Sequence, residues 1–411
     1  MADVLVIGAG PAGLAAAYRA AKAGLRSVVV DDNPAAGGQI WRGELAKPTS
    51  REAQAWFEKI RSVDIKLING ARVFQQPRPG TLLAETAQGV IELNYSNLVL
   101  ATGARERFLP FPGWTLPNVM GAGGLQALVK TGLPIEGKRV VVAGSGPLLF
   151  AVAAYLRSRG ANVLLIAEQA SSARLVKFGL GLFGKMSQAF DLKRQLQGVR
   201  NFNSCWVADA RGVDKLESVT LFQRGKRWRV ACDYLACGFH LVPNVELAEL
   251  LTCVVENGCV KVDQYQQTSI ANIYSAGETT GIGGLELSLV EGEIAGLAIA
   301  GKHEEARRLF PVREKQRKFA KLLNETFALR DELRQLPAAE TIVCRCEDVT
   351  FARLFEHSSW RAAKLQTRCG MGPCQGRVCG GAVEFLFGWR AESVRPPVLP
   401  VRVESLIRSA E

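Results

Sequence analysis

Five of the ten cysteines are concentrated between residues 344 and 379. One residue separates Cys344 from Cys346, and four separate Cys374 from Cys379. Four thiolates from two short loops suit an iron–sulfur cluster or a tetrahedral zinc ion. Zinc ribbons normally use two Cys-x-x-Cys turns, so these spacings fit zinc less well. We therefore expect a metal cluster on these four thiols, with Cys369 as an alternative to Cys374.

A second chemical feature is the glycine turn Gly8-Ala9-Gly10-Pro11-Ala12-Gly13. It follows an apolar run at 3–7 and precedes an alanine-rich stretch at 14–22, which predicts strand, turn and helix. In such a turn the second glycine lets the backbone approach a pyrophosphate, and the third permits close helix–strand packing. The helix N-terminus attracts the phosphates. Asp31 ends the next β-branched run, where a carboxylate would accept hydrogen bonds from ribose hydroxyls.

Three further segments indicate FAD rather than NAD. The run 98–104, the run 273–278 and the pair Gly37-Gly38 resemble flavin-contacting segments of two-dinucleotide-fold flavoproteins, the class of glutathione and thioredoxin reductases. In that class an acidic residue, usually aspartate, holds the ribityl chain, and here it is Glu278. The resemblance implies an α/β fold and these cofactor contacts: Gly8, Gly10, Pro11, Ala12, Gly13, Asp31, Gly38, Gln39, Ala101, Thr102, Gly103, Gly277 and Glu278.

The stretch 138–168 repeats the strand–turn–helix–strand pattern, so we predict a second doubly wound domain. Its turn, Gly144-Ser145-Gly146, has Leu149 where the third glycine belongs. By residue count Ala167 takes the place of the acid, and Glu168 comes one step late, facing the other side of the strand. We therefore expect a degenerate domain that does not bind NAD(P). The alternatives are a structural relic or an adenine-nucleotide site without chemistry.

The cysteine region resembles the bacterioferritin-associated-ferredoxin type of 2Fe–2S module. The matching segments are Cys344–Val349 and Thr367–Arg377; 111–117, 238–244 and 277–284 match the wider family pattern. That family is the alpha subunits of opine oxidases, hydrogen cyanide synthase, and heteromeric proline and D-hydroxyproline dehydrogenases. The resemblance implies a 2Fe–2S cluster on Cys344, Cys346, Cys374 and Cys379, and an FAD-dependent beta subunit that oxidises the substrate. It also permits a small ferredoxin-like gamma subunit and FMN at a subunit interface.

The charge pattern and the apolar runs limit the partners. The net charge is +12, but no run of basic residues marks a nucleic-acid arm. No secretory signal is apparent, and the uncharged run 140–156 contains a glycine turn, so it is not a membrane span. We expect a cytoplasmic protein, peripheral to the inner membrane only through its partner or electron acceptor.

We predict four regions along the chain. An FAD-binding domain comprises residues 1–115 and 255–300, and residues 116–254 form the second, NAD-type domain. A charged, solvated helical linker covers residues 301–340. The 2Fe–2S module and a proline-rich tail, extended over 395–400, cover residues 341–411.

The preferred function is the electron-transfer subunit of a heteromeric amino- or imino-acid dehydrogenase with a dye- or quinone-linked acceptor. D-hydroxyproline or proline is the first substrate, and opines are the second. The alternatives are a self-contained NAD(P)H-dependent reductase and a zinc-stapled, FAD-binding assembly or regulatory protein. Residues 1–120 contain no cysteine pair for disulfide reduction, and Cys232 and Cys237 lie on an expected strand, as core residues or a redox pair. Catalytic residues are not identified; Arg105 and Arg107 are the basic groups near the expected flavin contacts.

Overall fold

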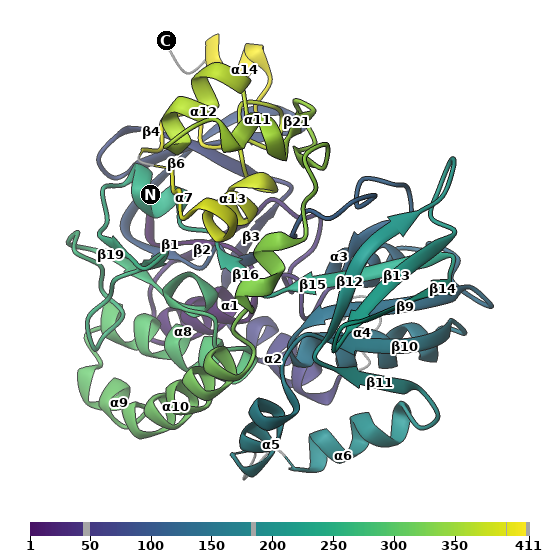
Figure 1. Ribbon diagram of the computed structural model, residues 1–411. Coiled ribbons are helices and arrows are strands. Elements are labelled where there is room, and N and C mark those ends of the chain that lie inside the picture. Colours follow the sequence, from purple (N-terminus) through teal and green to yellow (C-terminus); the bar gives the residue numbers. More distant parts are fainter. Residues whose placement is uncertain (44–49, 182–185, 392, 408–411) are drawn as a thin grey trace. The chain divides into compact units, whose positions relative to one another are not determined.

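The computed structural model describes residues 1–43, 50–181, 186–391 and 393–407 (Figure 1). The chain divides into two compact units. The first comprises residues 1–105, 242–321 and 393–411, and the second comprises residues 106–241 and 322–392. The cysteine module therefore belongs to the same unit as the second dinucleotide fold, whereas the proline-rich tail belongs to the first unit.

The first unit is built on a seven-stranded sheet of order β3-β2-β1-β6-β5-β4, with β19 beside β6. The strands next to β1 are parallel, whereas β4, β5 and the long β6 form an antiparallel meander. The strands of this sheet are β1 (Ala2–Ile7), β2 (Ser27–Asp31), β3 (Ile65–Asn69), β4 (Arg72–Arg78), β5 (Thr81–Thr86), β6 (Gly89–Leu100) and β19 (Ile273–Ser275). Strands β17 (Val255–Glu256) and β18 (Cys259–Val260) pair in a separate two-stranded sheet.

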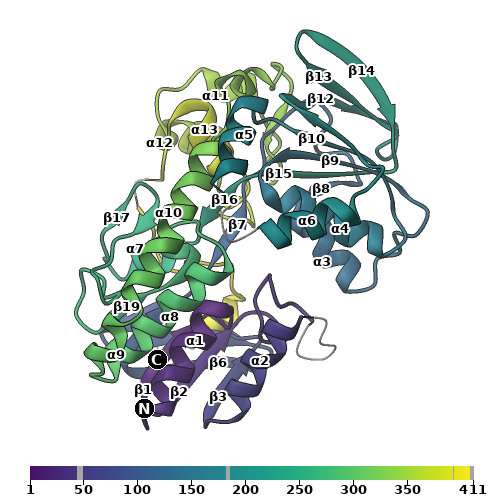
Figure 2. The ribbon, with the colours of Figure 1, turned by 90° about the horizontal axis from the view of Figure 1, so that it is seen from below.

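Two helices of this unit, α1 and α8, lie side by side in both views (Figure 2). They approach closely because Gly292 of α8 has no side chain: a Cβ there would lie 2.1 Å from the Ala12 carbonyl oxygen. The helices of the unit are α1 (Pro11–Lys22), α2 (Arg51–Arg61), α7 (Glu246–Leu250), the 3-10 turn η1 (Gly277–Thr280), α8 (Leu285–Ile299), α9 (His303–Arg307), the first part of α10 (Phe310–Thr326) and α14 (Val403–Ile407).

The second unit contains a five-stranded parallel sheet of order β11-β10-β9-β15-β8 and an antiparallel sheet, β12-β13-β14. Its strands are β8 (Val119–Gly121), β9 (Arg139–Ser145), β10 (Asn162–Glu168), β11 (Arg200–Asn203), β12 (Cys205–Arg211), β13 (Ser218–Gln223), β14 (Lys226–Ala231) and β15 (Tyr234–Phe239). Its helices are α3 (Ala122–Lys130), α4 (Pro147–Ser158), α5 (Ser172–Leu180) and α6 (Met186–Gln195). Strands β7 (Ala104–Glu106) and β16 (Leu241–Pro243) lie where the chain passes between units.

The cysteine module is a small, mostly helical part of the second unit. It consists of the 3-10 helix η2 (Asp331–Gln335), β20 (Ile342–Cys344), β21 (Val349–Thr350), α11 (Phe351–Phe355), α12 (Trp360–Thr367) and α13 (Cys379–Phe387). The predicted α/β class with two dinucleotide folds is confirmed, because each predicted glycine turn joins a parallel strand to a helix. Every helix of the described residues is too short or too polar to cross a bilayer.

Candidate cofactor sites

The first glycine turn has the geometry of a phosphate-binding turn. Gly13 permits close packing, since a Cβ there would lie 1.9 Å from the Gly8 carbonyl oxygen. Gly10 differs, because a Cβ there would have only the Gly38 Cα, at 4.0 Å, as a neighbour. Helix α1 begins directly afterwards, so its free N–H groups face the same region. The space above Gly10 is therefore available to a pyrophosphate.

The predicted ribose ligand, Asp31, lies beside this turn. Its Oδ2 accepts a hydrogen bond from the Ala9 amide at 2.6 Å, and its Oδ1 accepts one from the Asn33 amide at 2.8 Å. A carboxylate has about four acceptor sites, so Asp31 can hold the turn and still accept from a ribose hydroxyl. Asp31 is the last residue of β2. This is the end of the parallel strands where nucleotides bind in such sheets.

The second predicted segment, Ala101 to Gly103, is fixed by backbone and side-chain bonds. The Ala101 amide donates to the Ile7 carbonyl at 2.9 Å. Thr102 Oγ1 donates to the Asn244 carbonyl at 2.7 Å, and Asn244 Nδ2 donates back to the Thr102 carbonyl at 2.9 Å. The segment following β6 is thereby held next to the turn after β1.

The third predicted segment contains a buried carboxyl group, one oxygen of which has no hydrogen-bond partner among the described residues. Glu278 Oε1 accepts a hydrogen bond from the Gly284 amide at 2.8 Å. Its Oε2 is buried and has no partner among the described residues. Burial raises the pKa of Glu278 to about 7. Because a buried oxygen without a partner is costly, this site fits a ligand hydroxyl such as one of the ribityl chain. Glutamate can therefore serve where aspartate is usual.

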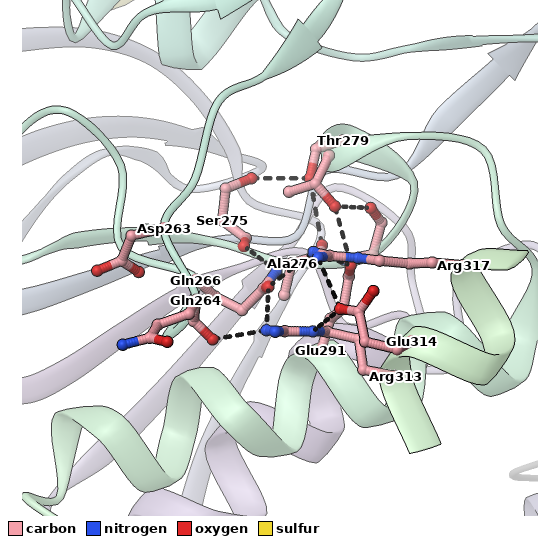
Figure 3. A network of polar contacts seen from close by, with 12 residues as sticks. Asp263, Gln264, Gln266, Ser275, Ala276, Thr279, Glu291, Arg313, Glu314 and Arg317 are labelled. Atoms are coloured by element: carbon pink, nitrogen blue, oxygen red, sulfur yellow. Dashed lines mark hydrogen bonds and ion pairs between the residues drawn. The ribbon is translucent and has the colours of Figure 1, made fainter. Parts of the chain in front are cut away.

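The turn that carries Glu278 is held by hydrogen bonds to Glu291 of α8, which is 2% exposed. Glu291 Oε2 accepts hydrogen bonds from the Gly277 amide at 3.1 Å and from Thr280 Oγ1 at 2.7 Å. Its Oε1 accepts one from Arg317 Nη2 at 3.2 Å (Figure 3). Helix α10 is thus linked by hydrogen bonds to the flavin-site turn.

The same network buries a second arginine of α10. The Arg313 side chain is 4% exposed, and its Nη1 donates to the Gln264 carbonyl (Figure 3). Its guanidinium also lies 4.5 Å from the centre of the Phe310 ring. The expectation that residues 303–335 form a solvated connection is wrong at this position, because the backbone and Phe310 compensate the burial of the charge. Glu291, an acid within the largely apolar helix α8, was the available signal for this network.

These contacts bring most of the predicted flavin ligands together. Gly38 lies against Gly10, and a Cβ on Gly277 would lie 2.8 Å from the Ala12 Cβ. Gln39 is exposed. The residues fit FAD: open space at the phosphate turn, an acid for the ribose and an unsatisfied buried carboxyl oxygen for the ribityl chain. The assignment of individual contacts remains a prediction.

The second dinucleotide fold corrects the residue count made from the sequence. Strand β10 contains an irregularity between Val163 and Leu165, where the register with β9 shifts by one residue. Such a bulge inserts one residue and reverses the facing of those that follow. Glu168 therefore pairs with Gly144, and its Oε2 accepts a hydrogen bond from the Gly146 amide at 2.7 Å. Glu168 is thus the counterpart of Asp31, and the expectation that it faces away was wrong.

Leu149, in the place of the third glycine, is accommodated by a neighbouring strand. It is wholly buried. Gly238 of β15 lies beside it, and even a Cβ at Gly238 would lie in ordinary van der Waals contact with Leu149 Cδ2, at 3.4 Å. The substitution therefore does not disrupt the packing of α4 against the sheet.

The structure gathers three thiols of the cysteine module. The sulfur atoms of Cys344, Cys369 and Cys379 lie within 4.8 Å of one another, and all three residues are buried. The Gly370 amide donates to Cys344 Sγ at 3.5 Å. Two of these residues belong to the predicted ligand set, and Cys369 is the predicted alternative. Converging buried thiols fit a thiolate-bound metal cluster better than a hydrophobic core.

The other two predicted ligands lie apart from this group. Cys346 is exposed and Cys374 is half-buried. The two residues are neighbours, because the Cys346 thiol lies within hydrogen-bonding reach of both the backbone and the thiol of Cys374. Gly372 is close by, because a Cβ there would lie 2.3 Å from the Cys346 Cβ. The loop containing Cys374 thus lies next to Cys346, and the ligand set remains a prediction.

The module docks on the second dinucleotide fold through the motif at 111–117. Trp114 Nε1 donates a hydrogen bond to the Ile342 carbonyl at 2.6 Å, two residues before Cys344. Phe385 of α13 and Leu333 join Trp114 in one hydrophobic cluster. The family-like segment around Trp114 therefore has a structural role in anchoring the cysteine module.

The other candidate residues take part in the protein's own packing and ion pairs. Cys232 and Cys237 are completely buried, and burial raises the pKa of both thiols, that of Cys232 to about 12. They are core residues. Arg105 forms an ion pair with Glu246 at 2.8 Å and donates to Asn244 Oδ1 at 2.8 Å. Arg107 lies 3.8 Å from a Glu384 carboxylate oxygen.

The fold and the first site define a flavoprotein with two dinucleotide folds. Residues 2–299 match the family model of the pyridine nucleotide-disulphide oxidoreductases, and the chain belongs to this family. It is therefore an FAD-dependent oxidoreductase. The matched region ends before the cysteine module, so the family model does not test the resemblance of that module.

Relatives over nearly the whole length narrow the group to FAD-dependent dehydrogenase subunits. The chain is 32% identical to hydrogen cyanide synthase subunit HcnB of Pseudomonas aeruginosa, over 92% of this chain and 90% of that protein. It is 30% identical to an opine oxidase subunit of Agrobacterium tumefaciens, over 98% of this chain and 91% of that protein. The predicted resemblance to this group is confirmed.

Solved structures agree on the fold. L-proline dehydrogenase from P. horikoshii has a TM-score of 0.68 at 19% identity and covers 98% of this chain and 79% of its own. Thioredoxin reductase from T. acidophilum has a TM-score of 0.56 at 19% identity, over 73% of this chain and 98% of its own. At these identities the likeness concerns the fold alone.

Proposed function

We propose that this chain is the electron-transfer subunit of a heteromeric FAD-dependent dehydrogenase that oxidises an amino or imino acid. The observation that carries the proposal is the group of buried thiols, Cys344, Cys369 and Cys379, within a chain whose family binds FAD. FAD accepts an electron pair and an iron–sulfur cluster transfers single electrons. A chain with both groups is suited to relay electrons from a substrate to an acceptor.

The chain's own residues support binding and orientation of the flavin. The open turn at Gly10 and the start of α1 would hold the pyrophosphate, and Asp31 the ribose. Glu278 would accept a hydrogen bond from the ribityl chain through its unsatisfied oxygen. Glu291 and Arg317 keep the Gly277 turn in shape.

A separate subunit is proposed to oxidise the substrate. Amino-acid oxidation needs a cation that holds the substrate carboxylate beside the flavin. Arg105, two residues after the predicted contact Gly103, is already bound to Asn244 and Glu246. HcnB and the opine oxidase relative are both named as subunits of enzymes. We propose D-hydroxyproline or proline as the first substrate to test.

For the cluster we propose 2Fe–2S ligation by Cys344, Cys346, Cys374 and Cys379, with Cys369 as the alternative to Cys374. Four cysteine ligands are usual for such clusters. Ligation by this set would draw the pair Cys346 and Cys374 towards Cys344 and Cys379. The buried position of Cys369 makes it the decisive residue for the alternative.

The proposal is tested by measuring FAD, iron and zinc in anaerobically purified chain, with single Cys→Ser variants. We expect FAD and two irons per chain in the wild type. Iron and the cluster's share of the visible absorbance should be lost in Cys344→Ser and Cys374→Ser, with the flavin absorbance kept, and iron should be retained in Cys369→Ser. If iron is lost in Cys369→Ser but kept in Cys374→Ser, then Cys369 and not Cys374 is the cluster ligand. Stoichiometric zinc without iron would refute the electron-transfer assignment.

A further inference from the structure

The glycine turn of the second dinucleotide fold is covered by a stretch of the chain's own backbone. This stretch, residues 327–330, follows α10 and is called the closing segment here. Ser145 Oγ, in the middle of the turn, donates a hydrogen bond to the Phe327 carbonyl at 2.8 Å. Phe327 is 2% exposed, and its ring meets that of Phe178 edge-on at 5.1 Å. The turn is therefore closed to solvent on this side.

Gln169, which follows Glu168 and is completely buried, binds the closing segment with both ends of its amide. Its Nε2 donates to Ser145 Oγ at 2.8 Å and to the carbonyls of Phe327 and Ala328 at 3.4 and 3.3 Å. Its Oε1 accepts from the Arg330 amide at 3.2 Å. This side chain sits at the end of β10, the region in which an adenosine ribose would be bound.

A positively charged side chain also contacts the segment. Arg174 Nη1 donates to the Ala328 carbonyl at 3.1 Å. A guanidinium and a hydroxyl beside a glycine turn are groups that elsewhere bind phosphate oxygens. Here they bind peptide carbonyls, which carry partial negative charge. The closing segment thus makes hydrogen bonds of the kind that a nucleotide would make.

Comparison with the first fold identifies the closing segment as the essential difference. In both folds the acid at the end of the second strand accepts a hydrogen bond from the turn: Asp31 from the Ala9 amide at 2.6 Å, and Glu168 from the Gly146 amide at 2.7 Å. The acid therefore does not distinguish the two folds. A Cβ at Gly10 would have only the Gly38 Cα at 4.0 Å as a neighbour, and a Cβ at its equivalent, Gly146, would have none within 4 Å. The two turns therefore differ at Ser145, which takes the place of Ala9 and donates to the Phe327 carbonyl.

We propose that the second dinucleotide fold is a socket whose ligand is the chain's own closing segment. Residues 327–330 take the place of a dinucleotide and exclude NAD(P)H. They also fix the start of the connection to the cysteine module, since Leu333 and the backbone of Ile342 next contact the cluster around Trp114. This inference concerns the second fold and stands whether or not the chain relays electrons.

The first test is nucleotide binding to the full, FAD-loaded chain. Equilibrium dialysis with NADH, NADPH and ADP is expected to show no saturable binding up to millimolar concentration, and NADH should not bleach the flavin. Saturable binding of any of the three with micromolar affinity would overturn the proposal.

The second test measures the closing segment directly by hydrogen exchange of the Arg330 amide. Its acceptor is Gln169, so exchange should be slow in the wild type and at least about tenfold faster in Gln169→Ala, as expected for loss of about 1.4 kcal/mol of local stability. Gln195→Ala, an exposed glutamine of the same unit, is the matched control and should leave exchange unchanged. Equal exchange rates of the Arg330 amide in the wild type and in Gln169→Ala would refute the proposal that the closing segment occupies this fold.

Discussion

The carboxylate of Glu291 offers the sharpest test of how the flavin site is held. Replacing it by alanine removes the acceptor of the Gly277 amide and of the Thr280 hydroxyl, and the partner of Arg317. The buried Gly277 amide, left without an acceptor, costs about 1–3 kcal/mol. The Thr280 hydroxyl is half-buried and can donate to the Gly277 carbonyl at 2.9 Å instead, so it adds less. Arg317 is 38% exposed and can turn to water, so it adds little. We therefore expect Glu291→Ala to lower the free energy of unfolding by about 3 kcal/mol.

The measurement is urea unfolding of the FAD-loaded chain, followed by flavin fluorescence. Because the Gly277 turn loosens, the dissociation constant of FAD should also rise by about tenfold or more, equivalent to about 1.4 kcal/mol. Glu314→Ala is the matched control: Glu314 lies 3.3 Å from Arg317 but is 54% exposed, so its loss should cost at most about 1 kcal/mol. If both variants unfold at the same urea concentration, the network does not support the flavin site.

Three further predictions concern the two turns and the module. Gly10→Val should purify folded but without FAD, because its φ of −75° suits any residue and its side chain would fill the phosphate space; full FAD occupancy would place the site elsewhere. Burial raises the pKa of Glu168 from 4.5 to about 7. The folded chain should therefore lose stability as the pH rises from about 4.5 to about 7, by about 3 kcal/mol in total. The fall in melting temperature from about pH 5 to about pH 8 should therefore be smaller in Glu168→Gln, and an identical fall would contradict the assignment. Trp114→Phe should lose the bond to the Ile342 carbonyl and make the cysteine module more sensitive to protease, at unchanged FAD content; unchanged cleavage would show that Trp114 does not anchor it.

The first dinucleotide fold could be predicted because its signals are local. The spacing from Gly8 to Asp31 specifies strand, turn, helix and strand within one short stretch. Because β2 pairs with β1 without a bulge, counting residues along the sequence places Asp31 correctly. The same count failed at Glu168 because a bulge in β10 inserts one residue that the sequence does not reveal. Counting residues along a strand assumes regular pairing, and one irregularity is enough to reverse an assignment.

Features that depend on distant segments were not predictable in this way. Arg313 lies in a charged helix that is typical of a solvated linker, and its burial follows from groups about fifty residues earlier in the chain. Nothing local to Phe327 indicates that its carbonyl meets Ser145, 182 residues away. Likewise, the spacing of the five cysteines does not show that Cys369 lies beside Cys344 and Cys379. In each case the three-dimensional packing supplies the partner.

We propose above all that this chain relays electrons while a separate flavoprotein oxidises the substrate. The most direct measurement is dye reduction by proline, D-hydroxyproline and opines, first with this chain alone and then with the proposed FAD-dependent beta subunit added. We expect no turnover by the isolated chain and turnover by the complex with proline or D-hydroxyproline, abolished by Cys344→Ser without loss of FAD. Turnover by the isolated chain at the rate of the complex would contradict the relay and make Arg105 and Arg107 the first residues to mutate.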